Sequence, residues 1–301
     1  MELSDVKKGL TDPAALLREI NKLYHTRGRK YSYNPHGTDV FAHEDWDNLI
    51  VLDACRYDTF KEQIDINGHL EKRTSRGGMS PEFIQGNFSN KRLYDVVYLS
   101  ANEWFAQLRD EINVDIHRFI NLQTDHLDLA GVSVRPETVT EQALRIAEEY
   151  PDKRLIIHYM QPHQPYIGPT GEEHFKLSPG LIETLRQSDD ISDKLLWEAY
   201  RENLDIVLAH AEELSSKLTG KTVITSDHGE LLGERVSPIP IKTYGHFDGL
   251  YVDELVDVPW FICDHSERKT IQPEVPDTTQ KVGCENVDAI ENRLRQLGYK
   301  T

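Results

Sequence analysis

The sequence has 301 residues, with 51 acidic side chains against 34 basic ones, a formal net charge of −17 and 38% hydrophobic residues. A chain of this length can bury a sizeable core, and its compact apolar runs indicate a folded protein rather than a disordered one. The acidic excess argues against a nucleic-acid-binding protein, which needs a basic surface, and against electrostatic docking on anionic membranes.

Apolar runs alternate with helix-like segments along the chain. In chain order, the patterns predict a helix from Pro13, an irregular stretch up to residue 45, and then strands at 48–53, 94–100, 153–160, 221–227 and 257–263, separated by helices at 57–64, from Ser80, at 102–110, at 135–150 and at 192–218, with a last helix at 287–299. This alternation is typical of a doubly wound α/β fold, with a mostly parallel sheet and helices on both faces. We expect one domain over 1–301, in which 1–45 form an N-terminal helix and irregular extension.

The cysteines and the hydropathy pattern bear on location. Cys55, Cys263 and Cys284 form no CxxC pair, and such a low, odd count fits a reducing compartment. The N-terminus lacks the apolar core of a signal peptide, and no apolar run approaches the roughly 20 residues that span a bilayer. We therefore expect a cytoplasmic protein without a transmembrane segment; the sequence does not indicate its oligomeric state.

Three of the predicted strands lead into polar side chains. Asp53 ends the first strand, His158 lies in the third, and Asp227 and His228 follow the fourth. The carboxyl ends of parallel strands form the edge where ligands bind in open α/β sheets. Each residue alone could be a turn former, a helix cap or a structural histidine, but three such strand ends together favour a site. Carboxylate with imidazole suits zinc or manganese, whereas carboxylate alone suits calcium or magnesium.

Ser80 is the best candidate nucleophile in the sequence. It lies between a Gly-Gly loop and Pro-Glu, so we expect it to cap a helix whose N-terminus attracts an anionic ester. A plain capping role fits the spacing equally well. Thr74 and Ser75 are alternatives in the same loop. Cys55 is a rival, but a small apolar side chain in the core is the simpler interpretation, because no base is identifiable near it. His246, in a Gly-His turn, is either a loop histidine or part of the site.

Six segments in order carry a resemblance to a known group of enzymes. The chain resembles the alkaline phosphatase/sulfatase superfamily, most of all its sulfatase-like branch, in the segments NLIVLDACRYD (48–58), SRGGMSPEF (75–83), VVYLSANEWF (96–105), IIHYMQPHQPY (156–166), VITSDHGELLGE (223–234) and GHFDGLYVDELVDVPWFI (245–262). The resemblance implies an alkaline-phosphatase-like fold with the site at the carboxyl ends of the strands.

The resemblance also implies residue roles. It implies that Asp53, Asp227 and His228 bind a divalent metal together with Ser80, the nucleophile of a covalent ester intermediate. His163 is similar to the residue that contacts the ester or protonates the leaving group, and His246 to a further ligand or acid. Further substrate contacts implied in this way are Arg56, Asn102, His158 and Lys242.

Two departures from the usual sulfatase pattern bear on the reaction. The nucleophile region lacks Cys-x-Pro-x-Arg, and Asp53 is followed by Ala54 where sulfatases have a second aspartate. Manganese or zinc is therefore favoured, with calcium or magnesium left open. We expect a metal-dependent hydrolase of phosphate or sulfate esters, whose substrate is a small-molecule, glycan or lipid ester. The alternatives are a phosphoryl transferase to an acceptor alcohol and a non-catalytic binder of anionic glycan or lipid headgroups.

Overall fold

The computed structural model describes residues 13–42, 45–175, 181–187, 191–265 and 267–275. Its elements in chain order are α2 (Pro13–Thr26), β1 (Asn48–Asp53), α3 (Tyr57–Gln63), β2 (Gly68–Thr74), α4 (Ser80–Phe88), β3 (Arg92–Ser100), α5 (Trp104–Leu108), β4 (Asp115–Asn121), α6 (Leu122–Asp125), the 3-10 turn η1 (Leu129–Gly131), α7 (Pro136–Glu149), β5 (Arg154–Pro162), α8 (Pro169–His174), α9 (Leu181–Gln187), α10 (Asp193–Lys217), β6 (Thr222–Ser226), β7 (Leu231–Val236), β8 (Ile241–Gly245), α11 (Asp253–Val256) and β9 (Asp257–Cys263).

A seven-stranded sheet in the order β2-β9-β6-β1-β5-β3-β4 forms the centre of the protein. The five strands from β6 to β4 run parallel, and β9 is antiparallel to its neighbours β6 and β2. The central strand β1 is buried along its whole length, which explains its unbroken apolar sequence. A separate hairpin pairs β7 with β8. The predicted fold class is confirmed.

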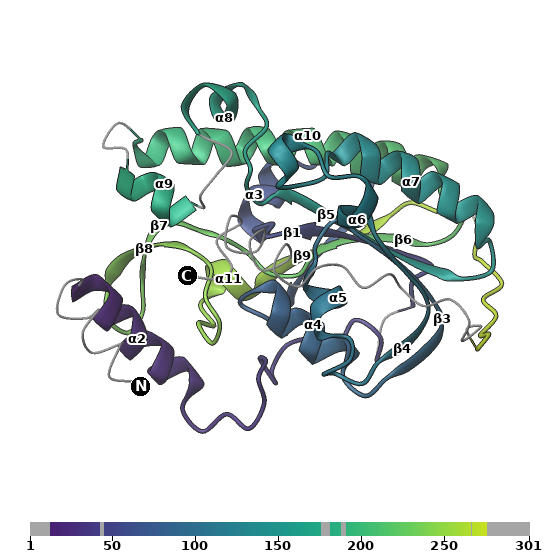
Figure 1. The fold of residues 1–301 in the computed structure, drawn as a ribbon, viewed down its shortest axis with the longest axis horizontal. Coiled ribbons are helices and arrows are strands. Elements are labelled where there is room, and N and C mark those ends of the chain that lie inside the picture. The colour runs from purple at the N-terminus through teal and green to yellow at the C-terminus, as the bar shows by residue number, and fades with distance from the viewer. Residues whose placement is uncertain (1–12, 43–44, 176–180, 188–190, 266, 276–301) are drawn as a thin grey trace.

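Helices cover both faces of the sheet. Figure 1 shows α7 and α10 side by side on one face and α4 and α5 on the other. Within the described residues, no helix is both long enough and apolar enough to cross a membrane.

The buried aromatic cluster of Phe88, Tyr98, Phe105 and Phe119 fills the space between α4, α5 and the sheet. This packing fixes α4, and with it Ser80, against the ends of the strands.

The five predicted strands are confirmed to within two residues at most ends, and so are the helices at 13, 57, 80, 104, 136 and 193. Four strands were not predicted. β2 and β4 are edge strands with few buried side chains, and β7 and β8 form a half-exposed hairpin, so none of them carries a long apolar run. The helix predicted at 287–299 lies outside the described residues.

Candidate active site

Three neighbouring strands bring their polar ends together. β1 lies between β5 and β6 in the sheet. Asp53 is the last residue of β1, Asp227 directly follows β6, and His158 of β5 pairs with Val51, two residues before the end of β1. Because all three strands run parallel, their ends share one edge of the sheet. The sequence prediction that this edge collects Asp53, His158 and Asp227 is therefore confirmed.

Four side chains converge at this edge, and we call Asp53, His158, Asp227 and His228 the metal cluster. Each of them is 0% exposed. Nε2 of His158 lies 3.7 Å from Oδ2 of Asp227 and 4.0 Å from Oδ2 of Asp53. Nε2 of His228 lies 3.4 Å from Oδ2 of Asp227 and 3.6 Å from Oδ1 of Asp53. Two carboxylates and two imidazoles thus surround one small volume.

Hydrogen bonds on the outer side of the cluster orient its ligand atoms. Nδ1 of His158 lies 2.8 Å from the hydroxyl of Tyr98, and Nδ1 of His228 lies 2.8 Å from the carbonyl of Gly229. Both Nε2 atoms consequently face the carboxylates. Oδ1 of Asp227 accepts hydrogen bonds from the backbone N–H of Ala54 at 3.1 Å and of His228 at 2.8 Å, which leaves Oδ2 directed inward. Ala54 has φ +59°, so its left-handed backbone is part of this arrangement.

The pKa shifts keep the histidines ready to bind a cation. Burial lowers the pKa of His158 to about 4 and also lowers the pKa of His228. Burial alone would raise the pKa of Asp227, but the charges of His228 and His158 and hydrogen bonds hold it below its ordinary value. The lowered pKa values of the histidines favour neutral imidazoles at neutral pH, and that of Asp227 favours an ionised carboxylate, the forms in which these groups ligate metal.

Ser80 lies beside the metal cluster. Its Oγ is 3.3 Å from Nε2 of His228 and accepts a hydrogen bond from Nδ2 of Asn102 at 3.1 Å. Asn102 also donates to Oδ2 of Asp53 at 2.7 Å, so one amide joins the serine to the cluster. Ser80 is the first residue of α4, and Met79 is the N-cap, so the expected capping role was wrong by one position. Its hydroxyl therefore does not cap the helix.

The Gly-Gly loop before Ser80 is required by close packing. A Cβ on Gly77 would lie 2.5 Å from the backbone nitrogen of Phe83, and one on Gly78 would lie 2.8 Å from the carbonyl oxygen of Leu250. The loop is tight enough that only glycine fits without moving backbone. It therefore sets the height of α4 above the sheet edge.

A second group of side chains that could hold a metal ion, which we call the outer cluster, contains His163, Glu230 and His246. One ligand atom from each lies within 4.8 Å of the others. Nδ1 of His246 is 3.2 Å from both carboxylate oxygens of Glu230. The ring of His246 has its centroid 4.5 Å from that of His228 and 5.2 Å from that of His163. His246, whose role the loop position left open, therefore joins the site.

Burial controls protonation in the outer cluster. It raises the pKa of Glu230 to about 7 and lowers the pKa values of His163 and His246 to about 4. The Glu230 carboxyl thus holds a proton near neutrality while the histidines do not. The sequence reasoning missed Glu230, although it stands in the segment TSDHGE, two residues after His228. Its position close to Asp227 and His228 in the chain is the feature of the sequence that could have indicated a place in the site.

Two predicted substrate contacts are engaged elsewhere. Lys242 forms an ion pair with Asp193 at 2.6 Å on the half-exposed hairpin, so its predicted contact with substrate is not supported. The guanidinium of Arg56 is held by Asp58 and Glu234 and donates to the carbonyl of Glu230 at 3.0 Å. Arg56 therefore supports the Glu230 segment. His158, the third predicted contact, is 0% exposed and faces the carboxylates of Asp53 and Asp227.

The alternative nucleophiles lie outside the reactive position. Cys55 is fully buried, and burial raises the pKa of its thiol well above the ordinary value, which fits a small apolar side chain in the core. The hydroxyl of Ser75 donates to the carbonyl of Asp227 and accepts from the N–H of Gly77 at 3.1 Å. Thr74 is the last residue of the edge strand β2. Ser80 is thus the hydroxyl that the fold brings to the metal cluster.

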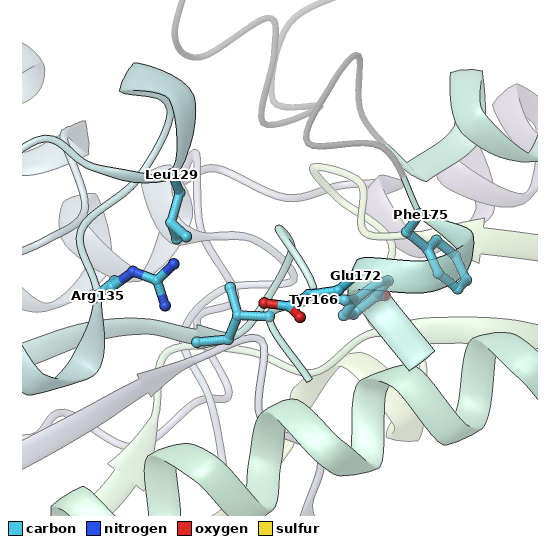
Figure 2. Close-up of a pocket in the computed structure, with 6 residues that line it drawn as sticks. Leu129, Arg135, Tyr166, Glu172 and Phe175 are labelled. Atoms are coloured by element: carbon cyan, nitrogen blue, oxygen red, sulfur yellow. The ribbon is translucent and has the colours of Figure 1, made fainter. Parts of the chain in front are cut away.

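A cavity of about 180 Å³ lies along the segment that follows His163. Figure 2 shows Tyr166 and Glu172 between Arg135 and Leu129 on one side and Phe175 on the other. Burial, and then the charge of Glu230, raises the pKa of Tyr166. Tyr166 follows His163 by three residues, so the cavity lies close in the chain to the outer cluster.

Comparisons with known proteins gave matches to solved structures alone. No protein-family model and no curated protein matches the chain. Lipooligosaccharide phosphoethanolamine transferase A (EptA) from Neisseria meningitidis matches with 14% identity and a TM-score of 0.47, over 83% of this chain and 55% of that one. An alkaline phosphatase superfamily protein from Vibrio parahaemolyticus matches with 13% identity and a TM-score of 0.44, over 86% and 71%. A 2-O GAG sulfatase, BT1596, matches with 13% identity and a TM-score of 0.44, over 76% and 68%.

The matches include a protein of the alkaline phosphatase superfamily and a sulfatase, and these are the groups that the sequence motifs resemble. The chain spans about half the length of the EptA chain. At such identities and TM-scores the likeness assigns no activity to this chain. Its activity has to be inferred from the site itself.

Proposed function

We propose that the protein is a metal-dependent enzyme that cleaves or transfers the phosphoryl group of a phosphate ester, with Ser80 as nucleophile. The observation that carries this proposal is the position of the Ser80 hydroxyl, 3.3 Å from Nε2 of His228 and hydrogen-bonded to Asn102 at the N-terminus of α4. A serine there meets an anionic ester on the positive end of a helix. A serine also favours phosphate over sulfate, since no cysteine stands at this position.

The residues of the metal cluster fit a divalent metal. Nε2 of His158 is buried and has no hydrogen-bond partner among the described residues. An unsatisfied buried nitrogen that faces two carboxylates is explained if it coordinates a cation. The donors are two carboxylates and two imidazoles, a set that suits zinc or manganese better than calcium or magnesium. When bound, such a metal lowers the pKa of a nearby hydroxyl and stabilises negative charge on the ester.

Residues of this chain position the nucleophile and supply a proton to the leaving group. Asn102 fixes the Ser80 hydroxyl beside His228, the hydroxyl loses its proton to solvent, and the resulting oxygen attacks the phosphorus. The Ser80 O–P bond forms while the bond to the leaving alcohol breaks. The leaving oxygen takes a proton from the outer cluster, in which Glu230 carries one near neutral pH. Water or an acceptor alcohol then attacks phosphorus and gives its proton to the Glu230 carboxylate, while the Ser80 O–P bond breaks and frees Ser80.

The outer cluster has two uses that lead to the same outcome. It can supply a proton, as above, or it can hold a second divalent metal through His163, Glu230 and His246. Either offsets the negative charge that develops on the leaving oxygen. The number of metal ions bound per chain, measured by elemental analysis after removal of excess metal, separates the two.

The test is release of p-nitrophenol from a phosphate monoester, a phosphate diester and a sulfate ester, after chelation and again with zinc, manganese, calcium or magnesium. We expect metal-dependent turnover of a phosphate ester that Ser80→Ala abolishes while bound metal is retained. Ser89→Ala is the matched control, because Ser89 is the C-cap of the same helix and its hydroxyl donates to the carbonyl of Gln85. Bound metal without turnover of any ester, with or without an acceptor alcohol, would instead favour a binder of anionic headgroups.

A further inference from the structure

The N-terminal helix α2 presents its apolar side to solvent. Leu16, Ile20, Leu23 and Tyr24 recur at i, i+4, i+7 and i+8, which is one face of a helix, and all four are exposed, Leu23 by 60%. In contrast, Asn21 on the inner side is 0% exposed. Its amide accepts from the N–H of Ile239 at 2.8 Å and donates to the Ile239 carbonyl at 2.9 Å. A surface helix ordinarily buries its apolar face, so this orientation is reversed.

The reversed orientation is fixed by polar contacts. Lys22 forms an ion pair with Asp248 at 2.7 Å, and Nε2 of His25 lies 3.0 Å from the carbonyl oxygen of Ser237. After the helix, Arg29 pairs with the buried Glu82 at 3.0 Å. Figure 1 shows α2 at the rim of the molecule, alongside β8. The helix is thus attached through its polar side and keeps its apolar side outward.

The charge of this region is opposite to that of the chain. Residues 13–31 contain five basic residues and one acidic residue, Glu19, whereas the whole chain carries −17. Arg27 and Lys30 are exposed, and the guanidinium of Arg27 lies 3.8 Å from the ring centre of Tyr24. The expectation that the protein avoids anionic membranes used the average charge, which does not describe this helix.

We propose that α2 docks in the plane of an anionic lipid bilayer. An exposed apolar stripe bordered by arginine and lysine is typical of helices that lie in the headgroup region. Exposed Tyr24 and Tyr31 suit the same region, because a tyrosine ring is apolar at one end and polar at the other. A second copy of the chain is disfavoured, since it would bring two cationic helices together.

Docking of α2 has a consequence for the site. The segment that α2 holds, from Ser237 to Gly249, carries His246 of the outer cluster. A bilayer that contacts α2 would therefore lie on the same side of the molecule as the segment that carries His246. If the proposed function holds, the substrate is an ester carried by a lipid. The docking itself does not require that function.

The experiment is flotation of the full chain with vesicles of equal parts phosphatidylglycerol and phosphatidylcholine, and with vesicles of phosphatidylcholine alone. We expect binding to the anionic vesicles that weakens at high salt, where the Debye length falls to about 3 Å. Ile20→Ser/Leu23→Ser should weaken it by about tenfold or more, because two apolar side chains no longer enter the bilayer. Arg27→Glu/Lys30→Glu should abolish the preference for anionic vesicles.

Val275→Ser is the matched control, because Val275 is an exposed apolar residue outside α2 and its change should leave binding unaltered. Circular dichroism confirms that each variant is folded. Ser80→Ala should bind vesicles as the unmodified chain does, which keeps this test separate from that of the proposed function. Equal vesicle binding by Ile20→Ser/Leu23→Ser and the unmodified chain would overturn the proposal. So would a dimer, seen by sedimentation equilibrium, that Leu23→Ser dissociates.

Discussion

Nε2 of His158 lies 3.7 Å from Oδ2 of Asp227, and both side chains are fully buried at the edge of the sheet. The separation is longer than a hydrogen bond, and the nitrogen has no other partner among the described residues. A buried polar atom left unsatisfied costs about 1–3 kcal/mol. Coordination of one cation by both atoms would remove that cost, and the pair is therefore the strongest local indication of a metal.

Tyr98→Phe should weaken metal binding without removing a ligand. The Tyr98 hydroxyl orients His158 through a 2.8 Å hydrogen bond to Nδ1, and loss of such an outer contact typically costs about 10–100-fold in metal affinity. Competition with a chelator of known affinity measures the change. Tyr159→Phe is the control, because Tyr159 is equally buried but bonds Thr140. Equal affinities in the two variants would contradict the ligand role of His158.

Ser80→Ala should lower the turnover of a phosphate ester by about 10³-fold or more, since loss of a nucleophile removes the covalent route. Metal content should stay the same, because the carboxylates and histidines remain. Steady-state kinetics and elemental analysis of the same sample give both quantities. A variant that keeps more than a tenth of the activity would show that another group attacks.

A second metal held by the outer cluster should bind with an affinity that depends on pH through Glu230. Its pKa is raised to about 7, so the carboxylate is protonated below that pH and competes with the metal. Affinity should therefore rise as the pH increases through about 7 and level off above it, with uptake of metal releasing a proton at pH 6. Calorimetry in buffers of different ionisation enthalpy measures the proton. Glu230→Gln should abolish the step, and Glu172→Gln in the neighbouring cavity should preserve it.

The same shift makes a prediction about stability without metal. The pKa of Glu230 is higher in the folded protein than the ordinary 4.5, so folding favours the protonated carboxyl. The contribution of Glu230 to the free energy of unfolding is fully present below about pH 4.5 and is lost as the pH rises through about 7. Urea unfolding of metal-free protein at these pH values checks the sign. Glu230→Gln should show less loss over this range.

Glu82→Gln should destabilise the fold by about 3 kcal/mol, the cost of breaking a buried ion pair by removing one partner. The Glu82 carboxylate accepts from Arg29 and Tyr251 at one oxygen and from the N–H of Gly78 at the other. In glutamine the amide nitrogen would oppose the N–H of Gly78. Urea unfolding compares this variant with Glu198→Gln, an exposed change on α10. A cost below about 1 kcal/mol would mean that water replaces these contacts.

The sequence predicted the central part of the fold because buried parallel strands leave a local signature. β1, β5 and β6 appear as unbroken apolar runs, and the residues at their ends follow directly from the order of the chain. The edge strands β2 and β4 leave no such signature, since solvent reaches one side and their side chains are mixed. The cytoplasmic location and the single domain stay predictions.

By itself, the sequence determined that Asp53, Asp227 and His228 lie at one edge of a parallel sheet, because the end of a strand is a local property. Only the tertiary structure decided that Tyr98 orients His158, that Glu230 meets His246, and that Lys242 points to Asp193 instead of the site. It also decided that α2 turns its apolar side outward. These relationships join residues far apart in the chain, and they depend on how side chains pack, which no local pattern of residues encodes.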